Sequence, residues 1–386
     1  MINWQIRPAE ARDGDILKAL WRYAFHSDGE AFVKWYFDTY HRFSETMVAT
    51  APSGEVVASL QSIELQLEKK GQLLNTAYVV GVDAFPEVRG QGAVAALMQA
   101  ALADSPHQGL LLMPFEGAFY RPMGFRYIDH HGRLESPMAD LYAHSAKTDL
   151  HLMRFALDKA PISRLDEIYR AWQDDRYAFF VKRDSRRWKA VLDDLQLEGG
   201  YGVLVDDGRD NLGYLLYNLQ DDAFLIREMA YRSEEARQAL YRYVTGHRSQ
   251  LARVSWSAPL DEPAVAQPAA GKLAVAYEPF MMWRFLSPAC LPFFADRGPE
   301  SPLCFAFQDD FLSRKSVWQW DQRGLYEASD ARPAFSVTPS LLSEMVFGSG
   351  SVRLPGDATA PRARAQWEAL RDLFPRRPLL YINEYF

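Results

Sequence analysis

A basic loop that contains two glycines is the part of the sequence best suited to chemistry. Residues 81–98 read GVDAFPEVRGQGAVAALM, in which a strand-like run ends at Pro86 and a loop opens directly into a helical pattern. Gly90 and Gly92 have no Cβ, so their backbone N–H groups can approach a ligand closely. The first turn of a helix leaves N–H groups unpaired at the positive end of its dipole, and Arg89 adds a formal charge. This combination predicts a phosphate site; the alternative is a tight strand-to-helix turn.

A second candidate segment lies downstream, where residues 113–125 read MPFEGAFYRPMGF. The phenol of Tyr120 is a proton donor suited to a leaving group that gains negative charge. Glu116 is a carboxylate four residues earlier and is therefore a candidate base. The structural alternatives are a packed aromatic ring for Tyr120 and a surface or helix-capping role for Glu116.

Both segments require an α/β layer to position them. Residues 56–60, 63–67 and 74–82 are strand-like, and residues 94–101 carry one apolar helical face before a short buried strand at 109–113. Strand, glycine loop, helix, strand is the order of a βαβ unit. A similar order of strands and a helix recurs over residues 201–257 without the glycine loop, which predicts a degenerate internal repeat.

The composition divides the chain into three parts. A polar stretch at 136–150 and a proline- and alanine-rich stretch at 261–271 separate domains that we place at 1–145, 146–280 and 281–386. Strands are expected in the third part at 303–307 and 317–320, with helices at 339–347 and 363–374. Its aromatic side chains either form a core or line an apolar cavity: Trp283, Phe285, Phe293 and Phe294.

The overall composition is that of a globular protein. Of 386 residues, 48% are hydrophobic and 24% are charged, and no apolar run is long enough for a membrane helix. A net charge of −7 argues against nucleic acid as a partner. Two cysteines without metal-ligand spacing predict neither a disulfide framework nor a metal. The N-terminus lacks a signal-peptide pattern, so we expect a cytoplasmic protein.

The loop and the aromatic segment together carry a resemblance to a known family. Residues 89–94, RGQGAV, resemble the acyl-CoA loop R/Q-x-x-G-x-G/A of the GNAT superfamily, with Val94 departing from the usual last position. Tyr120 to Phe125 resembles the Tyr-x-x-x-Gly-Phe string of the same enzymes. With the repeat and the chain end INEYF, the whole chain is similar to the Eis-type (enhanced intracellular survival) acetyltransferases. That resemblance implies an α/β (α+β) fold: tandem GNAT-like domains and a sterol-carrier-protein-like α+β domain.

The resemblance also implies a function. It predicts transfer of an acetyl group from acetyl-CoA, without a metal, to a primary amine of an aminoglycoside, a polyamine or a lysine side chain. Tyr120 would protonate the departing thiolate, and the α-carboxylate of Phe386 would act as the base. A homo-oligomer is implied, commonly a hexamer in the family. The residues expected around the co-substrate are Val82, Asp83, Ala84, Arg89, Gly90, Gln91, Gly92, Ala93, Val94, Ala95, Phe115 and Glu116.

Three alternatives stay open at this point. Phe386 can anchor the last strand rather than take part in catalysis. The chain can be a non-catalytic protein that binds acyl-CoA or an apolar ligand, although the intact glycine loop speaks against that. It can also resemble the tandem-GNAT aminoacyl transferases of peptidoglycan synthesis, which use charged tRNA, a partner that fits an acidic chain poorly.

Overall fold

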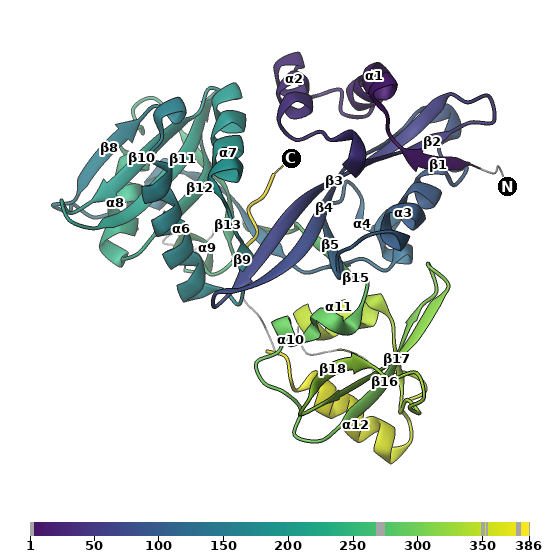
Figure 1. Cartoon of the computed structure of the whole chain (residues 1–386). Helices are drawn as coiled ribbons and strands as arrows, with labels where there is room; N and C mark the ends of the chain where they lie inside the picture. Colours follow the sequence, from purple (N-terminus) through teal and green to yellow (C-terminus); the bar gives the residue numbers. More distant parts are fainter. Residues whose placement is uncertain (1–3, 268–274, 349–351, 353, 376–379, 386) are drawn as a thin grey trace. The chain divides into compact units, whose positions relative to one another are not determined.

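The computed structural model describes residues 4–267, 275–348, 352, 354–375 and 380–385. Within these ranges the chain forms two compact units (Figure 1). The first unit joins residues 4–128 to residues 280–375, and the second joins residues 129–279 to the tail at 380–385, with the gaps just given. In the part of the chain so described, no helix is both long and apolar enough to cross a bilayer.

The N-terminal part of the first unit is built on one mixed sheet. Its strands lie in the order β1-β2-β3-β4-β5-β15-β6. All neighbours along this path are antiparallel except β4 and β5, which are parallel and are connected through α3, so the predicted βαβ unit is confirmed. The elements are β1 (Gln5–Pro8), α1 (Gly14–Ala24), α2 (Glu30–Thr39), β2 (Thr46–Thr50), β3 (Val56–Lys69), β4 (Gln72–Ala84), α3 (Ala93–Ala103), β5 (Gly109–Leu112), α4 (Gly117–Tyr120), β6 (Arg126–Tyr127) and β15 (Met282–Phe285).

The two faces of this sheet are covered by different helices. Val79 of β4 is buried in a cluster with Leu97 and Met98 of α3. The next residue, Val80, pairs with Gln61 of β3, whose side chain accepts a hydrogen bond from Tyr36 of α2. Because successive strand residues point to opposite faces, α3 lies on one face and α2 on the other.

Strand β15 enters this sheet from a distant part of the sequence. Met282 of β15 pairs with Leu112 of β5 on one side and with Tyr127 of β6 on the other, so the strand lies inside the N-terminal sheet. Arg284 of this strand is fully buried and forms an ion pair of 2.6 Å with Asp309. The pair joins the N-terminal sheet to the domain that follows.

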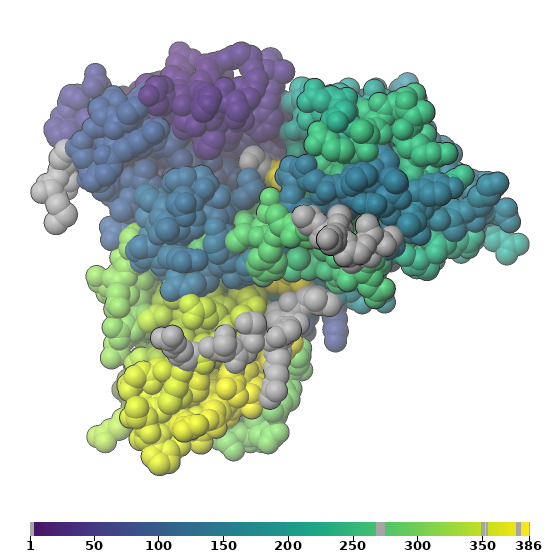
Figure 2. Space-filling model, turned by 180° about the vertical axis from the view of Figure 1, so that it is seen from behind, coloured from purple at the N-terminus to yellow at the C-terminus, as the bar shows by residue number. Residues whose placement is uncertain are grey.

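That following domain is a smaller α+β layer with its own sheet, in the order β18-β17-β16-β19. Figure 2 shows it space-filled, coloured lime to yellow. The four aromatic side chains singled out in the sequence are buried and pack edge to face, with Trp283 and Phe285 each 5.6 Å from Phe294, which supports a core role. Its elements are α10 (Leu291–Phe294), β16 (Leu303–Asp309), β17 (Arg314–Asp321), β18 (Gly324–Glu327), β19 (Ser336–Val337), α11 (Pro339–Phe347) and α12 (Pro361–Arg371).

The second unit repeats the βαβ arrangement without the glycine loop. Strands β12 and β13 are parallel and flank α8, as β4 and β5 flank α3. Where α3 follows a glycine, α8 follows Ser233, whose hydroxyl caps the helix by accepting from the Ala236 N–H. The predicted degenerate repeat is confirmed. Its sheet runs β14-β7-β13-β12-β11-β10-β8.

The elements of this second unit are β7 (His130–Pro137), α5 (Met138–Tyr142), β8 (His151–Phe155), α6 (Ile162–Arg176), β9 (Phe180–Val181), α7 (Ser185–Leu197), β10 (Tyr201–Asp206), β11 (Asn211–Gln220), β12 (Ala223–Tyr231), α8 (Glu234–Thr245), β13 (Arg253–Pro259), α9 (Pro263–Ala266) and β14 (Val275–Pro279).

Candidate active site

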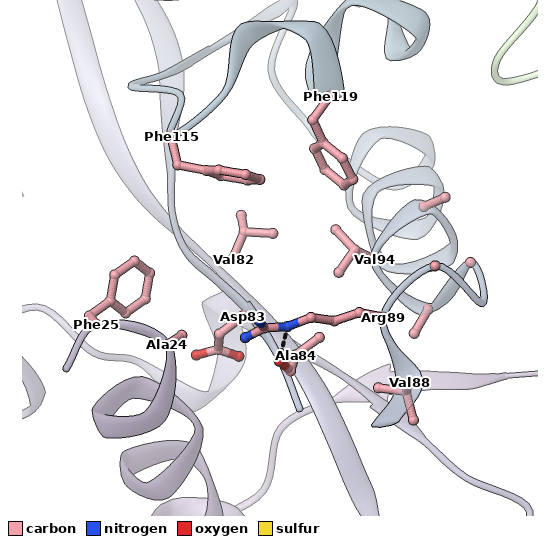
Figure 3. Close-up of a pocket in the computed structure, with 14 residues that line it drawn as sticks. Ala24, Phe25, Val82, Asp83, Ala84, Val88, Arg89, Val94, Phe115 and Phe119 are labelled. Carbon is pink, nitrogen blue, oxygen red and sulfur yellow. Dashed lines mark hydrogen bonds between the residues drawn. The ribbon is translucent and has the colours of Figure 1, made fainter. Parts of the chain in front are cut away.

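The site begins where β4 and β5 stop pairing. Their parallel ladder ends at Val79 and Leu112, whereas β4 continues to Ala84. The two strands therefore part over the last five residues of β4. A pocket of about 550 Å³ lies there (Figure 3). Its walls are mostly apolar and are formed by Ala24, Phe25, Val82, Asp83, Ala84, Val88, Arg89, Gly90, Gly92, Ala93, Val94, Ala95, Phe115 and Phe119.

The glycine loop closes one end of this pocket. Gly90 and Gly92 have φ angles of 75° and 88°, in the left-handed region that residues with a Cβ rarely adopt, and, chain neighbours apart, no atom of the described residues lies within 4 Å of a Cβ built at either position. Helix α3 begins at Ala93, and within the described part of the chain no side chain caps its first turn. The N–H groups of that turn are left for a ligand. A positive helix end without a competing cap is the arrangement that suits a phosphate.

Arg89 supplies the cation of the pocket. Its Nε donates a hydrogen bond of 3.1 Å to the carbonyl oxygen of Ala84, drawn as a dashed line in Figure 3, and its guanidinium lies 5.8 Å from the ring centre of Tyr23. These contacts hold the positive charge at the end of β4. The same end of the pocket therefore has both the helix dipole and a formal charge for an anion.

A β-bulge decides which way Asp83 points. Between Ser59 and Gln61 of β3 the register shifts, so that Ser59 pairs with Asp83 but Gln61 pairs with Val80. The extra residue in β4 places Asp83 on the same face as Val80, toward α1 and α2, because one residue of slip changes the face. Gly81 makes the bulge possible: its φ is 54°, and a Cβ there would lie 2.7 Å from the Trp21 ring of α1.

Tyr120 lies in an aromatic cluster beside the pocket. It is buried, and its ring centre is 5.8 Å from that of Phe115 and 5.0 Å from that of Phe119, both of which line the pocket. Burial raises the pKa of Tyr120 above its usual range, so the phenol is protonated at neutral pH. Glu116 caps α4, since its Oε1 accepts from the Ala118 N–H at 3.0 Å. The contacts therefore show a helix-capping role for Glu116, which was one of its two structural alternatives.

The structure brings together ten of the twelve residues expected around the co-substrate. Gln91 and Glu116 do not line the pocket: the Gln91 side chain donates to the Glu87 carbonyl oxygen, and Glu116 is the helix cap. Four lining residues were not predicted. Val88 directly precedes the glycine loop, and Phe119 directly precedes Tyr120. Only these positions beside the two motifs could have indicated that both residues line the pocket. Ala24 and Phe25 come from the end of α1, for which the sequence carried no signal.

The chain end can be followed to Tyr385, and Phe386 lies outside the described residues. Within the second unit, the Ile382 N–H donates to Asp129 at 2.7 Å, and Glu384 is buried between Arg183 and Arg187, at 2.8 and 2.6 Å. Burial alone would raise the pKa of Glu384, but the two guanidinium groups lower it, so the carboxylate is ionised. The segment before the last residue is therefore fixed by buried polar contacts.

Comparisons with known proteins agree with this geometry. Two family profiles, each described as an acetyltransferase (GNAT) domain, match residues 5–128 and 180–285. Similar solved structures include a GCN5-related N-acetyltransferase from Anabaena variabilis (17% identity, TM-score 0.79), a probable N-acyltransferase from Enterococcus faecalis (15%, 0.82) and Eis1 from Mycobacterium abscessus (16%, 0.72). In all three, both chains are covered over 100% of their length. No curated protein sequence matches the chain.

The first profile covers the domain with the glycine loop, and the second covers most of the repeat that lacks it. The similar structures extend that agreement to the fold of the whole chain. The chain contains two tandem GNAT domains and is an N-acetyltransferase of the GNAT superfamily.

Proposed function

We propose that the pocket binds acetyl-CoA and that the chain transfers its acetyl group to a primary amine. One observation carries this proposal. The pocket runs from the end of β4, where this strand no longer pairs with β5, to the start of α3, where no described side chain caps the helix. The peptide groups at the end of β4 suit the amides of a pantetheine arm. Gly90, Gly92 and Arg89 suit the pyrophosphate, because N–H groups and a cation converge there without a Cβ in the way.

The chemistry that we propose is direct transfer. Bound acetyl-CoA would supply an activated acetyl group whose carbonyl an amine attacks. Tyr120, protonated at neutral pH, gives its proton to the departing sulfur. The α-carboxylate of Phe386 takes a proton from the amine nitrogen. What supports this role is the fixed tail, since Glu384 is anchored two residues before the chain end.

We further propose that the protein is of the Eis type, with a sterol-carrier-protein-like third domain, and that it works as a cytoplasmic homo-oligomer. The similarity to Eis1 from Mycobacterium abscessus along the whole chain supports the first statement. Proposed acceptors are aminoglycosides, polyamines and lysine side chains. The net charge of −7 favours such cations, because a negative field attracts them.

The experiment that tests this function is release of free thiol from acetyl-CoA across a panel of amines. We expect release with at least one of spermidine, kanamycin and a lysine peptide, and none when the amine is left out. Calorimetry with acetyl-CoA alone is the companion measurement. Acetyl-CoA binding without turnover on any amine would contradict the proposal and favour the alternative of a non-catalytic acyl-CoA-binding protein.

A further inference from the structure

Asp83 is a buried carboxylate with one oxygen unused. It is 3% exposed, and its Oδ1 accepts hydrogen bonds from the backbone N–H and the hydroxyl of Ser59, at 3.0 and 2.6 Å. Its Oδ2 has no hydrogen-bond partner among the described residues. The residue nevertheless lines the pocket, beside Ala24 and Phe25 (Figure 3). A buried polar atom without a partner is costly and is therefore rare.

The groups around Asp83 leave its charge uncompensated. Tyr36 of α2 is buried, and burial together with the charge of Asp83 keeps its pKa well above the usual range, so it is neutral. Strand β3 contributes Ser59 and Gln61, which do not titrate. Arg89, the cation of the loop, stacks on Tyr23 of α1 and donates its Nε to the Ala84 carbonyl. In the described part of the chain Asp83 forms no ion pair.

Burial raises the pKa of Asp83 to about 7, although the hydrogen bonds from Ser59 lower it. An ordinary aspartate is a poor proton acceptor at neutral pH because its pKa is about 4. A carboxylate whose pKa matches the working pH is much better suited to general base catalysis. Asp83 is therefore a pocket-lining residue with a buried, unpartnered carboxylate oxygen, and burial brings its pKa near the working pH.

The proposed reaction leaves a proton unassigned. An alkyl ammonium has a pKa near 10, so the acceptor arrives protonated. Its nitrogen must lose one proton before it attacks and a second one afterwards, when the amide forms. The Phe386 carboxylate accounts for one of these two protons. The proton that Tyr120 gives to sulfur is replaced later and does not remove either of them.

We propose that Asp83 takes the first proton from the acceptor ammonium. The N–H bond breaks, its electron pair stays on nitrogen, and a new O–H bond forms at Oδ2. The neutral amine then attacks, and Asp83 returns its proton to solvent after turnover. This inference rests on the proposed function and deepens it: the acceptor class is an amine that is cationic in solution and is discharged inside the site.

The decisive experiment compares wild type with Asp83→Asn, which keeps an oxygen for the Ser59 hydrogen bonds. The substrate is the best acceptor of the panel, and kcat/KM is measured from pH 6 to 10. We expect a loss of about 10²-fold at pH 7. The loss should shrink toward pH 10, because the free amine then enters neutral. A purely structural role for Asp83 predicts the same loss at every pH and would overturn the inference.

Two controls separate this role from simple packing. A fluorinated analogue of the acceptor, whose amine is largely neutral at pH 7, should lose little activity in Asp83→Asn. Ser59→Ala removes a hydrogen bond that favours the ionised carboxylate, so the acidic limb of the pH profile should move to higher pH. An equal loss with both acceptors, or an unmoved limb, would count against Asp83. Wild type that is inactive on every amine would instead contradict the proposed function itself.

Discussion

Gly92→Asp should lose acetyl-CoA binding, with an affinity at least about 100-fold weaker than that of wild type by calorimetry, or ~2.7 kcal/mol. Two effects act together. The φ of Gly92 is 88°, a conformation that aspartate adopts less readily than glycine, and the new carboxylate would face the pyrophosphate at the start of α3. Repulsion between the new carboxylate and the pyrophosphate is the larger effect, because no described side chain caps this helix end and screens the two negative charges from each other.

The chain offers a matched control for this prediction. Gly54, in the turn between β2 and β3, has a φ of 91°, and a Cβ there would also lie more than 4 Å from every other residue that the structure describes, its chain neighbours apart. Gly54→Asp therefore adds the same charge at a similar backbone conformation, away from the pocket. We expect Gly54→Asp to bind acetyl-CoA as wild type does. Unchanged affinity in Gly92→Asp would mean that the loop is only a turn.

The second large effect concerns the chain end. Adding one glycine after Phe386 keeps the ring, converts its carboxylate to an amide and moves the charge by ~3.5 Å. If that carboxylate is a base, kcat should fall by about 10²–10⁴, while acetyl-CoA affinity and thermal stability stay as in wild type. The buried contacts of Glu384 lie upstream of the change and should hold the tail in place.

Phe386→Leu is the matched variant, because it keeps the carboxylate and alters only the apolar side chain. It should retain most of kcat. Glu116→Gln tests Glu116 as the competing base. Because Glu116 accepts a hydrogen bond from the Ala118 N–H, we expect this substitution to affect mainly α4. If the glycine-extended protein turns over as fast as wild type while Glu116→Gln is inactive, the assignment of Phe386 is wrong.

Local patterns predicted much of the fold. The β4–α3–β5 unit followed from two strand-like runs, two glycines and one apolar helical face, because these signals lie within a short stretch of sequence. The helix predicted at residues 339–347 is α11, whose bounds agree. The repeat was visible because its strands and helix recur in a similar order. Asp13 directly precedes α1, a position typical of a helix-capping residue, but its carboxylate accepts hydrogen bonds from Arg7 and from the Glu10 N–H instead of capping the helix.

The features that the sequence did not reveal depend on long-range pairing. Nothing local indicates that Met282 of β15 pairs with Leu112, more than 160 residues away. The bulge at Gly81 is likewise invisible without its partner strand, yet it turns Asp83 to the face of α1 and α2. For that reason the sequence predicted Asp83 only as one of the residues around the co-substrate. Its unused oxygen and its raised pKa are properties of the folded sheet.

Acetylation of an amine at this pocket is best tested by the mass of the acceptor amine after incubation with acetyl-CoA and the protein. We expect the best amine of the panel to gain one acetyl group, in step with the thiol released. We expect the same product with Gly54→Asp and no product with Gly92→Asp. Thiol released without an acetylated amine, or acetylation that persists in Gly92→Asp, would contradict amine acetylation at this pocket.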